Sequence, residues 1–274
     1  MGIAAEKNGV IINADSLQIY NVLPLLTAQP SAEEKAAVPH RLYAFLGPEE
    51  KYSAQQWRDD AIREINDAFD KQRHPVIVGG TGLYIKALVE GLSPMPEVPP
   101  AIRAEAMALQ KDVGNPAFHA HLANIDPVMA GRLNPNDTQR LIRAYEVIKA
   151  TGESLAVWQA APGQGAPQDW RFRIIVKSPD RAELHRRCDD RFDQMMEKGA
   201  LKEVREQVNL LDTAPATHAL GFHPLQAHLR GEITLEEAVV RSKAETRQYV
   251  KRQDTWFHNQ VKPHPSIVEI LRIQ

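Results

Sequence analysis

A carboxylate follows directly on a run of apolar, β-branched residues near the beginning of the 274-residue chain. Residues 10–14 (VIINA) predict a buried strand, and Asp15, Ser16 and Gln18 come immediately after it. Enzymes built on parallel sheets hold catalytic groups where strands end. Asp15 could therefore accept a proton from a nucleophile while its neighbours bind a polar edge of the substrate. The spacing leaves a second interpretation equally open, in which Asp15 only caps the following helix.

A glycine-rich turn, VGGTGLY at residues 78–84, ends a second expected strand at residues 75–78. Its glycines could let a substrate backbone approach closely while Thr81 donates a hydrogen bond, although a tight turn from strand to helix is the more frequent meaning of such a segment. The turn lacks the third glycine of a dinucleotide fingerprint, and the chain contains neither GxxxxGKS nor GxxxxGKT. The sequence therefore predicts neither Rossmann-type nor Walker-A phosphate binding.

A group of residues that could contact phosphate lies on an expected helix at residues 138–150. Gln139 and Arg143 are four residues apart and share a face, with Arg140 beside them. Arginine forks next to an amide suit phosphate and base-edge recognition. On the residues alone, a solvated helix surface with Glu146 nearby is the favoured alternative.

A basic stripe on an expected helix repeats every four residues, at Lys243, Arg247 and Lys251, and aromatic residues follow at positions 256 and 257. A basic ridge beside aromatic rings suits a nucleic-acid backbone and stacked bases. A charged outer helix face with core aromatics behind it is an equally open interpretation.

One further arginine, Arg191, lies in the segment LHRRCDDRFDQMM of another expected helix. An arginine there could neutralise the charge of a leaving diphosphate. The commoner fate of such a residue is an ion pair with a nearby acid, here Asp189, Asp190 or Asp193.

The composition is that of a globular protein and excludes several classes. Hydrophobic residues make up 43% of the chain, and no window approaches the roughly 18 unbroken apolar residues that a membrane span needs. The formal net charge is −2, from 33 basic and 35 acidic residues, so whole-chain charge gives no support to a nucleic-acid partner. The single cysteine, Cys188, excludes an internal disulfide, and with His185 it forms at best half a metal site. We expect a cytoplasmic protein without a membrane partner.

The order of the expected elements predicts an α/β protein. Helices alternate with the first two strands, and residues 171–176 are the last expected strand. Four prolines between positions 94 and 100 mark a boundary, after which short helices form an inserted all-α piece. The expected division is a sheet core of residues 1–93 and 136–274 and a helical insertion of residues 94–135.

Several segments form a series along the chain: INADSLQIY, TAQPS, PHRL, YSAQQWRDDA, VGGTGLYIKALVEGL, DPVMAGRLNPNDTQRLIRAYEV, ALGF, GEITLEEA and KRQDTWF. From about Ile3 to Gln260, this series resembles the tRNA dimethylallyltransferase (tRNA isopentenyltransferase) family. The resemblance implies a P-loop NTPase-like parallel sheet flanked by helices, with an inserted all-α subdomain. It implies transfer of the dimethylallyl group of dimethylallyl diphosphate to the exocyclic amine of the adenine 3′ of a tRNA anticodon. It also implies Mg²⁺ as cofactor, diphosphate as product, and a monomer that binds the tRNA anticodon stem-loop.

Within this resemblance, Asp15 matches the family's general base and Arg191 matches an arginine of the reacting centre. A base is needed because the amine of adenine is a poor nucleophile, its lone pair being delocalised into the ring. Magnesium and Arg191 would stabilise the charge that builds on the departing diphosphate. The positions that match tRNA-contacting residues are Asp15, Ser16, Leu17, Gln18, Thr81, Arg103, Gln139, Arg140, Leu141, Ile142, Arg143, Lys251, Arg252, Gln253, Trp256 and Phe257.

The family places a GPTASGKS-like P-loop immediately ahead of the segment that resembles residues 3–9. The resemblance therefore implies an N-terminally truncated chain that lacks the first strand and the P-loop. Arg191 is then the one expected diphosphate contact, no metal ligand is identifiable, and we expect impaired transfer. Two other hypotheses stay open: a non-catalytic tRNA-binding remnant, and a relative that prenylates free adenine nucleotides.

Overall fold

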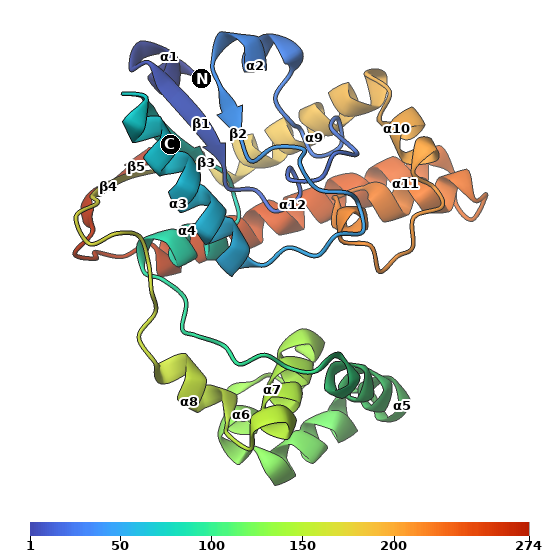
Figure 1. The fold of residues 1–274 in the computed structure, drawn as a ribbon. Coiled ribbons are helices and arrows are strands. Elements are labelled where there is room, and N and C mark those ends of the chain that lie inside the picture. The colour runs from blue at the N-terminus through green and yellow to red at the C-terminus, as the bar shows by residue number, and fades with distance from the viewer. Residues whose placement is uncertain (274) are drawn as a thin grey trace. The chain divides into compact units, whose positions relative to one another are not determined.

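The computed structural model describes residues 1–273 and divides into two compact units (Figure 1). The α/β unit comprises Met1–Val89 and the chain from Ala166 onward, and the helical unit comprises Glu90–Gly165. The helical unit is longer than the predicted insertion of residues 94–135, because later helices pack into the same core. The predicted return to the sheet core near Asn136 is therefore corrected to Ala166.

Three parallel strands form the first sheet of the α/β unit, in the order β2-β1-β3. The central strand β1 (Gly9–Asn13) is buried along its whole length, as its apolar β-branched run predicts. It pairs with β2 (His40–Arg41), which follows helix α2 (Ala32–Ala37), and with β3 (His74–Val78). The expected buried strand ahead of Asp15 is thus the middle of this sheet.

Helices cover both faces of this sheet. Successive side chains of a strand point to opposite faces. Ile12 packs against α3 (Ala54–Asp70) and α4 (Gly82–Val89), whereas Ile11 packs on the side of α1 (Gly2–Glu6). Both faces of β1 are thereby packed by apolar contacts, which holds the strand and the segment after it in place.

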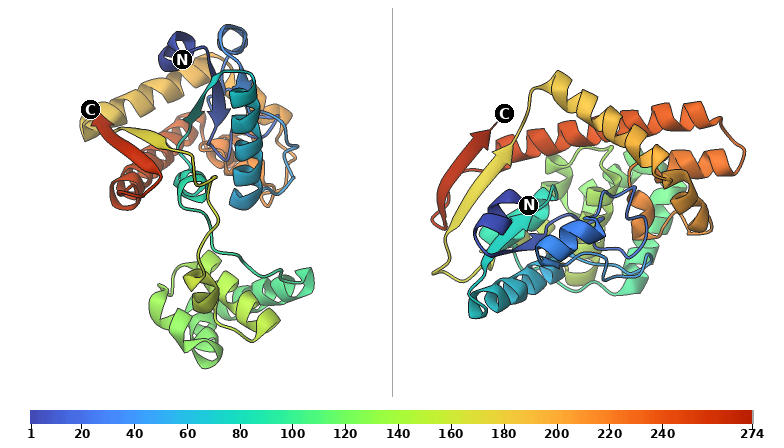
Figure 2. Two further views of the ribbon diagram at one scale, coloured as in Figure 1. Left: turned by 60° about the vertical axis from the view of Figure 1, so that its left-hand side comes forward. Right: turned by 90° about the horizontal axis from the view of Figure 1, so that it is seen from above.

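A second, two-stranded parallel sheet belongs to the same unit (Figure 2). It consists of β4 (Phe172–Lys177) and β5 (Ile267–Ile273), with an irregularity between Phe172 and Arg173. The sequence analysis placed the last strand at residues 171–176, so β5 is a correction. Within residues 1–273, β3 and β4 each pair along one edge only.

The remaining α-helices of the α/β unit share one apolar core, and a 3₁₀ helix lies between the second and third of them. Gly199, at φ 103°, separates the first two of them. Figure 2 shows α9 and α12 running beside one another, and their residues are in contact. These elements are α9 (Arg181–Glu197), α10 (Ala200–Glu206), the 3₁₀ helix η1 (Pro215–His218), α11 (Phe222–Leu229) and α12 (Leu235–Gln260).

The helical unit is built from four helices in the described chain. Gly114, at φ 74°, kinks the first of them, which agrees with the two shorter helices expected there. Asp137 caps α7 by accepting a hydrogen bond from the backbone of Arg140, and Gly152 ends that helix in the left-handed conformation. The helices are α5 (Pro100–Ile125), α6 (Pro127–Arg132), α7 (Thr138–Thr151) and α8 (Leu155–Ala160). No helix in residues 1–273 is long and apolar enough to cross a membrane.

Candidate active site

Asp15 lies just beyond the carboxyl end of β1 and is held by its own neighbours. The Asn13 side chain accepts a hydrogen bond from the Asp15 N–H at 2.8 Å and donates one to the Asp15 carbonyl at 2.9 Å. The Asp15 carboxylate accepts from the backbone N–H of Leu17 at 2.9 Å. Asn13 is fully buried and also donates to the carbonyl of Leu42. Asp15 therefore begins a tight turn, and no α-helix starts at this position.

The electrostatic surroundings of Asp15 act in opposite directions on its carboxyl group. Burial raises the pKa of Asp15 above its ordinary value and is the largest influence. The backbone N–H groups of Leu17 and Gln18 and the positive charge of Arg191 lower the pKa. A carboxylate with a raised pKa is a better proton acceptor, and Arg191 lies within its electrostatic reach.

Arg191 is an exposed residue of α9 whose guanidinium forms no ion pair within residues 1–273. The three acids that offered the alternative interpretation are engaged elsewhere. Asp189 contacts Arg247 at 2.6 Å, Asp193 contacts Lys243 at 2.6 Å, and Asp190 contacts Arg186 at 3.2 Å. Arg191 is therefore left available for a negatively charged ligand.

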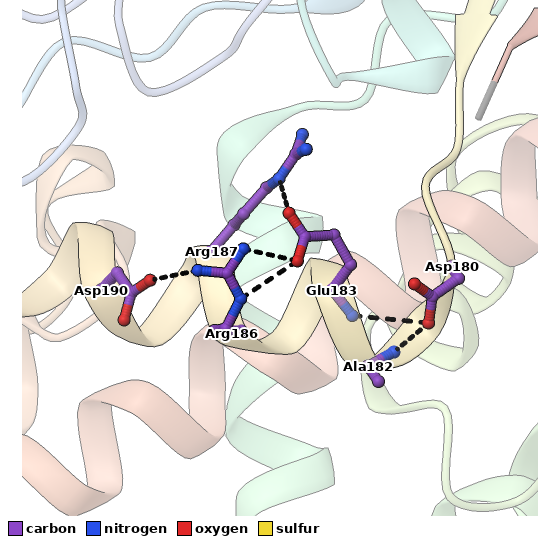
Figure 3. A network of polar contacts seen from close by, with 6 residues as sticks. All are labelled: Asp180, Ala182, Glu183, Arg186, Arg187 and Asp190. Carbon is purple, nitrogen blue, oxygen red and sulfur yellow. Dashed lines mark hydrogen bonds and ion pairs between the residues drawn. The ribbon is translucent and has the colours of Figure 1, made fainter.

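A polar network on the first half of α9 uses the neighbouring arginines (Figure 3). Glu183 accepts hydrogen bonds from Arg186 and from Arg187, each at 2.6 Å. Asp180 caps the helix through the backbone N–H groups of residues 182 and 183. Arg187 precedes Arg191 by one turn on the same helix face, and only Arg187 is tied to an acid.

The glycine-rich turn is filled by the chain itself. A Cβ at Gly79 would lie 2.1 Å from the backbone of Ala14, so this glycine is required for the turn to pass the end of β1. Thr81 accepts a hydrogen bond from the Ser16 N–H at 2.9 Å and donates to the Ser16 hydroxyl at 3.2 Å. The suggestion that these glycines admit a substrate backbone is corrected, because Ala14 and two side chains of α12 occupy the space.

Those two side chains, Gln253 and Trp256, were expected to contact tRNA. Gln253 donates a hydrogen bond to the carbonyl of Gly80 at 3.0 Å, and the Trp256 ring lies against Gly82. Trp256 also meets Phe257 edge to face, with ring centroids 5.1 Å apart. Both rings are half-buried, so their packing decides neither for the expected tRNA contact nor for the interpretation as core aromatics.

The basic stripe of α12 is only partly free. Lys243 and Arg247 are neutralised by acids of α9, which corrects the expectation of a continuous ridge for a nucleic-acid backbone. Lys251 is exposed and forms no ion pair in the described chain, and Arg252 lies over the Tyr249 ring, 5.8 Å from its centroid. The free positive charge of α12 is therefore at its C-terminal third.

The helical unit brings Arg103 of α5 and Arg143 of α7 to a single carboxylate, that of Glu146. Leu141 is fully buried in the core of this unit, so the expectation of tRNA contact by its side chain is corrected. Ile142 is half-buried beside it, whereas Gln139 and Arg140 are exposed. Gln139 and Arg140 thus form the solvated surface that was the favoured alternative, but Glu146 does not belong to it, because its side chain has no exposed surface.

Three tyrosines near Asp15 were missed by the sequence analysis. The negative charge of Asp15 and burial together raise the pKa of Tyr43 to about 12, and they also raise the pKa of Tyr84 and of Tyr249. Tyr84 stacks on Trp57 at 4.6 Å, and the Trp57 indole donates to the Asn13 carbonyl at 2.7 Å. The residues come from separate segments, so no local pattern could have grouped them.

The loop at residues 23–30 is anchored from two sides. Glu203 of α10 accepts hydrogen bonds from the backbone N–H groups of Leu25 at 2.8 Å and Leu26 at 2.9 Å. Gln18 donates to the carbonyls of Thr27 and Ala28. Gln18 thus connects the turn that carries Asp15 to this loop, a contact that its place in the sequence did not reveal.

Magnesium, which the resemblance implies, finds no preformed cage in the described residues. No group of three or more His, Cys, Asp or Glu side chains comes together there. Near Asp15 the other oxygen donors are the hydroxyls of Ser16 and Thr81, which bind each other. Magnesium often takes few protein ligands and several phosphate oxygens, so these residues could bind it only together with a diphosphate.

Comparisons with known proteins agree with this geometry. The chain matches the sequence model of the IPP transferase family over residues 18–260. It is 50% identical over 263 residues to the tRNA dimethylallyltransferase of Rhodospirillum centenum, covering 95% of this chain and 84% of that protein. The tRNA dimethylallyltransferase of Paramagnetospirillum magneticum is 49% identical over 261 residues, covering 94% of this chain and 82% of the relative.

A solved structure has the same fold. The full-length tRNA isopentenylpyrophosphate transferase of Bacillus halodurans superposes with a TM-score of 0.65 at 32% identity, covering 99% of this chain and 84% of that one. Sequence and fold therefore agree that the chain belongs to the tRNA dimethylallyltransferase (IPP transferase) family.

Proposed function

We propose that this chain transfers the dimethylallyl group of dimethylallyl diphosphate to the exocyclic amine of the adenine 3′ of a tRNA anticodon. Relatives that are 45–50% identical carry the name of this activity. One feature of the α/β unit carries the proposal. Asp15, with a pKa raised by burial, lies within electrostatic reach of an arginine that has no ion pair in residues 1–273.

The proposed step forms a bond between the amine nitrogen and the first allylic carbon and breaks the bond from that carbon to the diphosphate oxygen. The amine proton passes to the Asp15 carboxylate, and the electron pair of the broken bond leaves with the diphosphate. Arg191 stabilises the negative charge that develops on the leaving oxygens. The raised pKa of Asp15 favours its role, because the carboxylate takes up a proton more readily.

In this proposal, magnesium would bind only together with the diphosphate. When bound, it would neutralise charge on the leaving group. The described residues include no cluster of three acidic, histidine or cysteine ligands, so no step is assigned to the metal. Arg191 is the diphosphate contact that we assign within this chain.

The test is transfer of a labelled dimethylallyl group to an anticodon stem-loop in the presence of magnesium, measured under single-turnover conditions. We expect Asp15→Asn to lower the transfer rate about 10²–10⁴-fold, because the general base is lost. Asp67→Asn on α3, which removes a surface acid paired with Lys71, serves as the charge-matched control and should keep the parent rate. Equal rates for Asp15→Asn and the parent would contradict the proposed base.

The acceptor distinguishes the alternatives that the sequence left open. Label found in the stem-loop supports the proposal, whereas label found on adenosine monophosphate supplied at the same concentration supports a nucleotide prenyltransferase. RNA binding without transfer by the parent chain would identify a binding protein. A stem-loop with guanine in place of the target adenine should stay unlabelled.

A further inference from the structure

Glu146 of α7 is a carboxylate with no exposed surface, 0% of its side chain being accessible. Its neighbours in sequence, Tyr145 and Val147, belong to the apolar core of the helical unit. Burying a charged group in such surroundings is unfavourable unless it is paired and hydrogen-bonded. The position of Glu146 therefore calls for partners, and the structure supplies two.

Two arginines from different helices meet at this carboxylate. Arg143, one turn earlier on α7, contacts Oε1 through Nη1 at 2.6 Å. Arg103 of α5 contacts both oxygens through Nη1, each at 3.3 Å. Residues 103 and 146 are 43 positions apart, so this is a tertiary contact across the α5–α7 interface.

The outer ends of both arginines face solvent. The side chain of Arg103 is 54% exposed and that of Arg143 is 34% exposed. Each guanidinium reaches Glu146 through Nη1 alone, so Nε and Nη2 of both have no hydrogen-bond partner within residues 1–273. Two positive charges share one negative charge, which leaves a net charge of about +1 and several N–H donors at the surface.

We propose that Glu146 is a positioning residue, whose buried carboxylate fixes Arg103 and Arg143 side by side so that both bind phosphate groups of an RNA backbone. The inference rests on the proposed function, because the RNA is the tRNA acceptor. Guanidinium groups match phosphate with two parallel hydrogen bonds, and that geometry demands a fixed orientation. Without Glu146, two like charges from neighbouring helices would move apart.

The direction in which RNA affinity changes in Glu146→Gln distinguishes a positioning role of Glu146 from an effect of its charge alone. Removing an acid near a phosphate site raises the local positive charge, so charge alone predicts tighter RNA binding by Glu146→Gln. Positioning predicts weaker binding, because the arginines lose the group that orients them. We expect the dissociation constant of Glu146→Gln for an anticodon stem-loop to rise about tenfold at fixed salt.

Glu105→Gln is the matched control. Glu105 of α5 pairs with Lys149 of α7 at 3.9 Å, so it bridges the same two helices, but both side chains are exposed. Its loss should leave RNA affinity unchanged or slightly increased. A double and a triple variant complete the test, since Glu146→Gln should have no further effect once Arg103→Gln and Arg143→Gln are both present.

Two further measurements guard against a variant that fails to fold. Glu146→Asp keeps the charge but is one methylene shorter, so it should weaken RNA binding by less than Glu146→Gln while charge alone predicts no change. The Nη signals of Arg143 in ¹⁵N NMR spectra of the full chain should be resolved in the parent and broadened in Glu146→Gln. These signals report positioning without any RNA.

Unchanged or tighter RNA binding by a folded Glu146→Gln chain would overturn the inference. Unaltered arginine signals in that variant would do the same. A parent chain that binds no stem-loop would instead contradict the proposed function, and the NMR signals would then decide whether Glu146 holds the arginines.

Discussion

Asp15 of the α/β unit is half-buried and Glu146 of the helical unit is fully buried, and the two acids are held in different ways. Glu146 has no exposed side-chain surface and contacts two guanidinium groups. Asp15 accepts a backbone hydrogen bond from Leu17, and Arg191 acts on it only through its charge. One carboxylate is satisfied by its partners, whereas the other is left able to take a proton.

This difference assigns the two acids to different tasks. An acid in contact with two arginines keeps them oriented, so it is suited to shaping a binding surface. An acid that burial has made easier to protonate, with no arginine in contact, is suited to proton transfer. We therefore propose that the distribution of ion pairs separates the chemical step from RNA recognition, and each prediction below tests that proposal.

The largest expected effect is on the transfer rate, and it comes from replacing Arg191. We expect Arg191→Gln to lower the transfer rate about 10²–10³-fold, because the charge facing the leaving diphosphate is lost, while RNA affinity stays unchanged. Arg187→Gln is the control, since Arg187 lies one turn earlier on the same face but is tied to Glu183. Single-turnover rates and stem-loop binding would be measured for both. Equal losses of rate in the two variants would remove the distinction between a free and a paired arginine.

Stability should respond to the two acids with opposite signs. Glu146→Gln removes the negative charge and one of the two acceptor oxygens that the arginines share, and we expect the free energy of unfolding to fall by about 1–3 kcal/mol. Asp15→Asn should raise it by about 0.5–2 kcal/mol at pH 7, because the folded state no longer holds a desolvated charge. Urea unfolding would measure both. A loss of stability in both variants would show that Asp15 is as well compensated as Glu146.

The pH dependence of the Asp15 effect follows from the raised pKa. A carboxyl group whose pKa is higher in the folded state than in the unfolded state favours folding when protonated. The stability difference between Asp15→Asn and the parent should therefore be full above the folded-state pKa and shrink as pH falls through it.

The sequence was sufficient to predict Asp15 and its strand, because an apolar β-branched run that ends on an acid is a local pattern. It also predicted the helix at residues 138–150, which the structure has as α7 at Thr138–Thr151, because helical periodicity is a local pattern too. The burial of Glu146 could not be predicted, since the three-residue spacing to Arg143 is common on solvated helices and Arg103 comes from another helix.

The boundary between the two units was predicted wrongly for a related reason. The helical period of residues 138–151 is the same whether the helix covers a sheet or joins a bundle, and only its contacts with α5 decide. Strand β5 lies after a long helix and pairs with β4, which comes nearly a hundred residues earlier in the chain. The residues next to β5 therefore gave no signal that predicted this strand. Long-range contacts, which a single sequence does not display, account for both errors.

A smaller effect is expected on the pH profile of the reaction. The acidic limb of kcat/KM should lie above the ordinary carboxyl pKa of about 3.9, because Asp15 must be ionised to accept the proton. Arg191 lowers the pKa of Asp15, so Arg191→Gln should move this limb to higher pH as well as reduce the rate. Arg187→Gln should leave the limb in place. A limb that stays fixed in Arg191→Gln would show that the two groups do not interact.

The smallest effect is expected where basic residues of α12 are already paired. Arg247→Gln breaks a half-exposed ion pair with Asp189, so we expect a loss of only about 0.2–1 kcal/mol of stability and no change in RNA affinity. Lys251→Gln removes an exposed charge that has no ion pair in the described chain, and it should weaken RNA binding and reduce the salt dependence by about one phosphate contact. Stem-loop titrations at several salt concentrations would compare the two. Arg247→Gln could instead reduce the salt dependence of RNA binding as much as Lys251→Gln does. The acids of α9 would then not keep Arg247 from contacting RNA, and ion pairing would not distinguish the basic residues that bind RNA from those that only stabilise the fold.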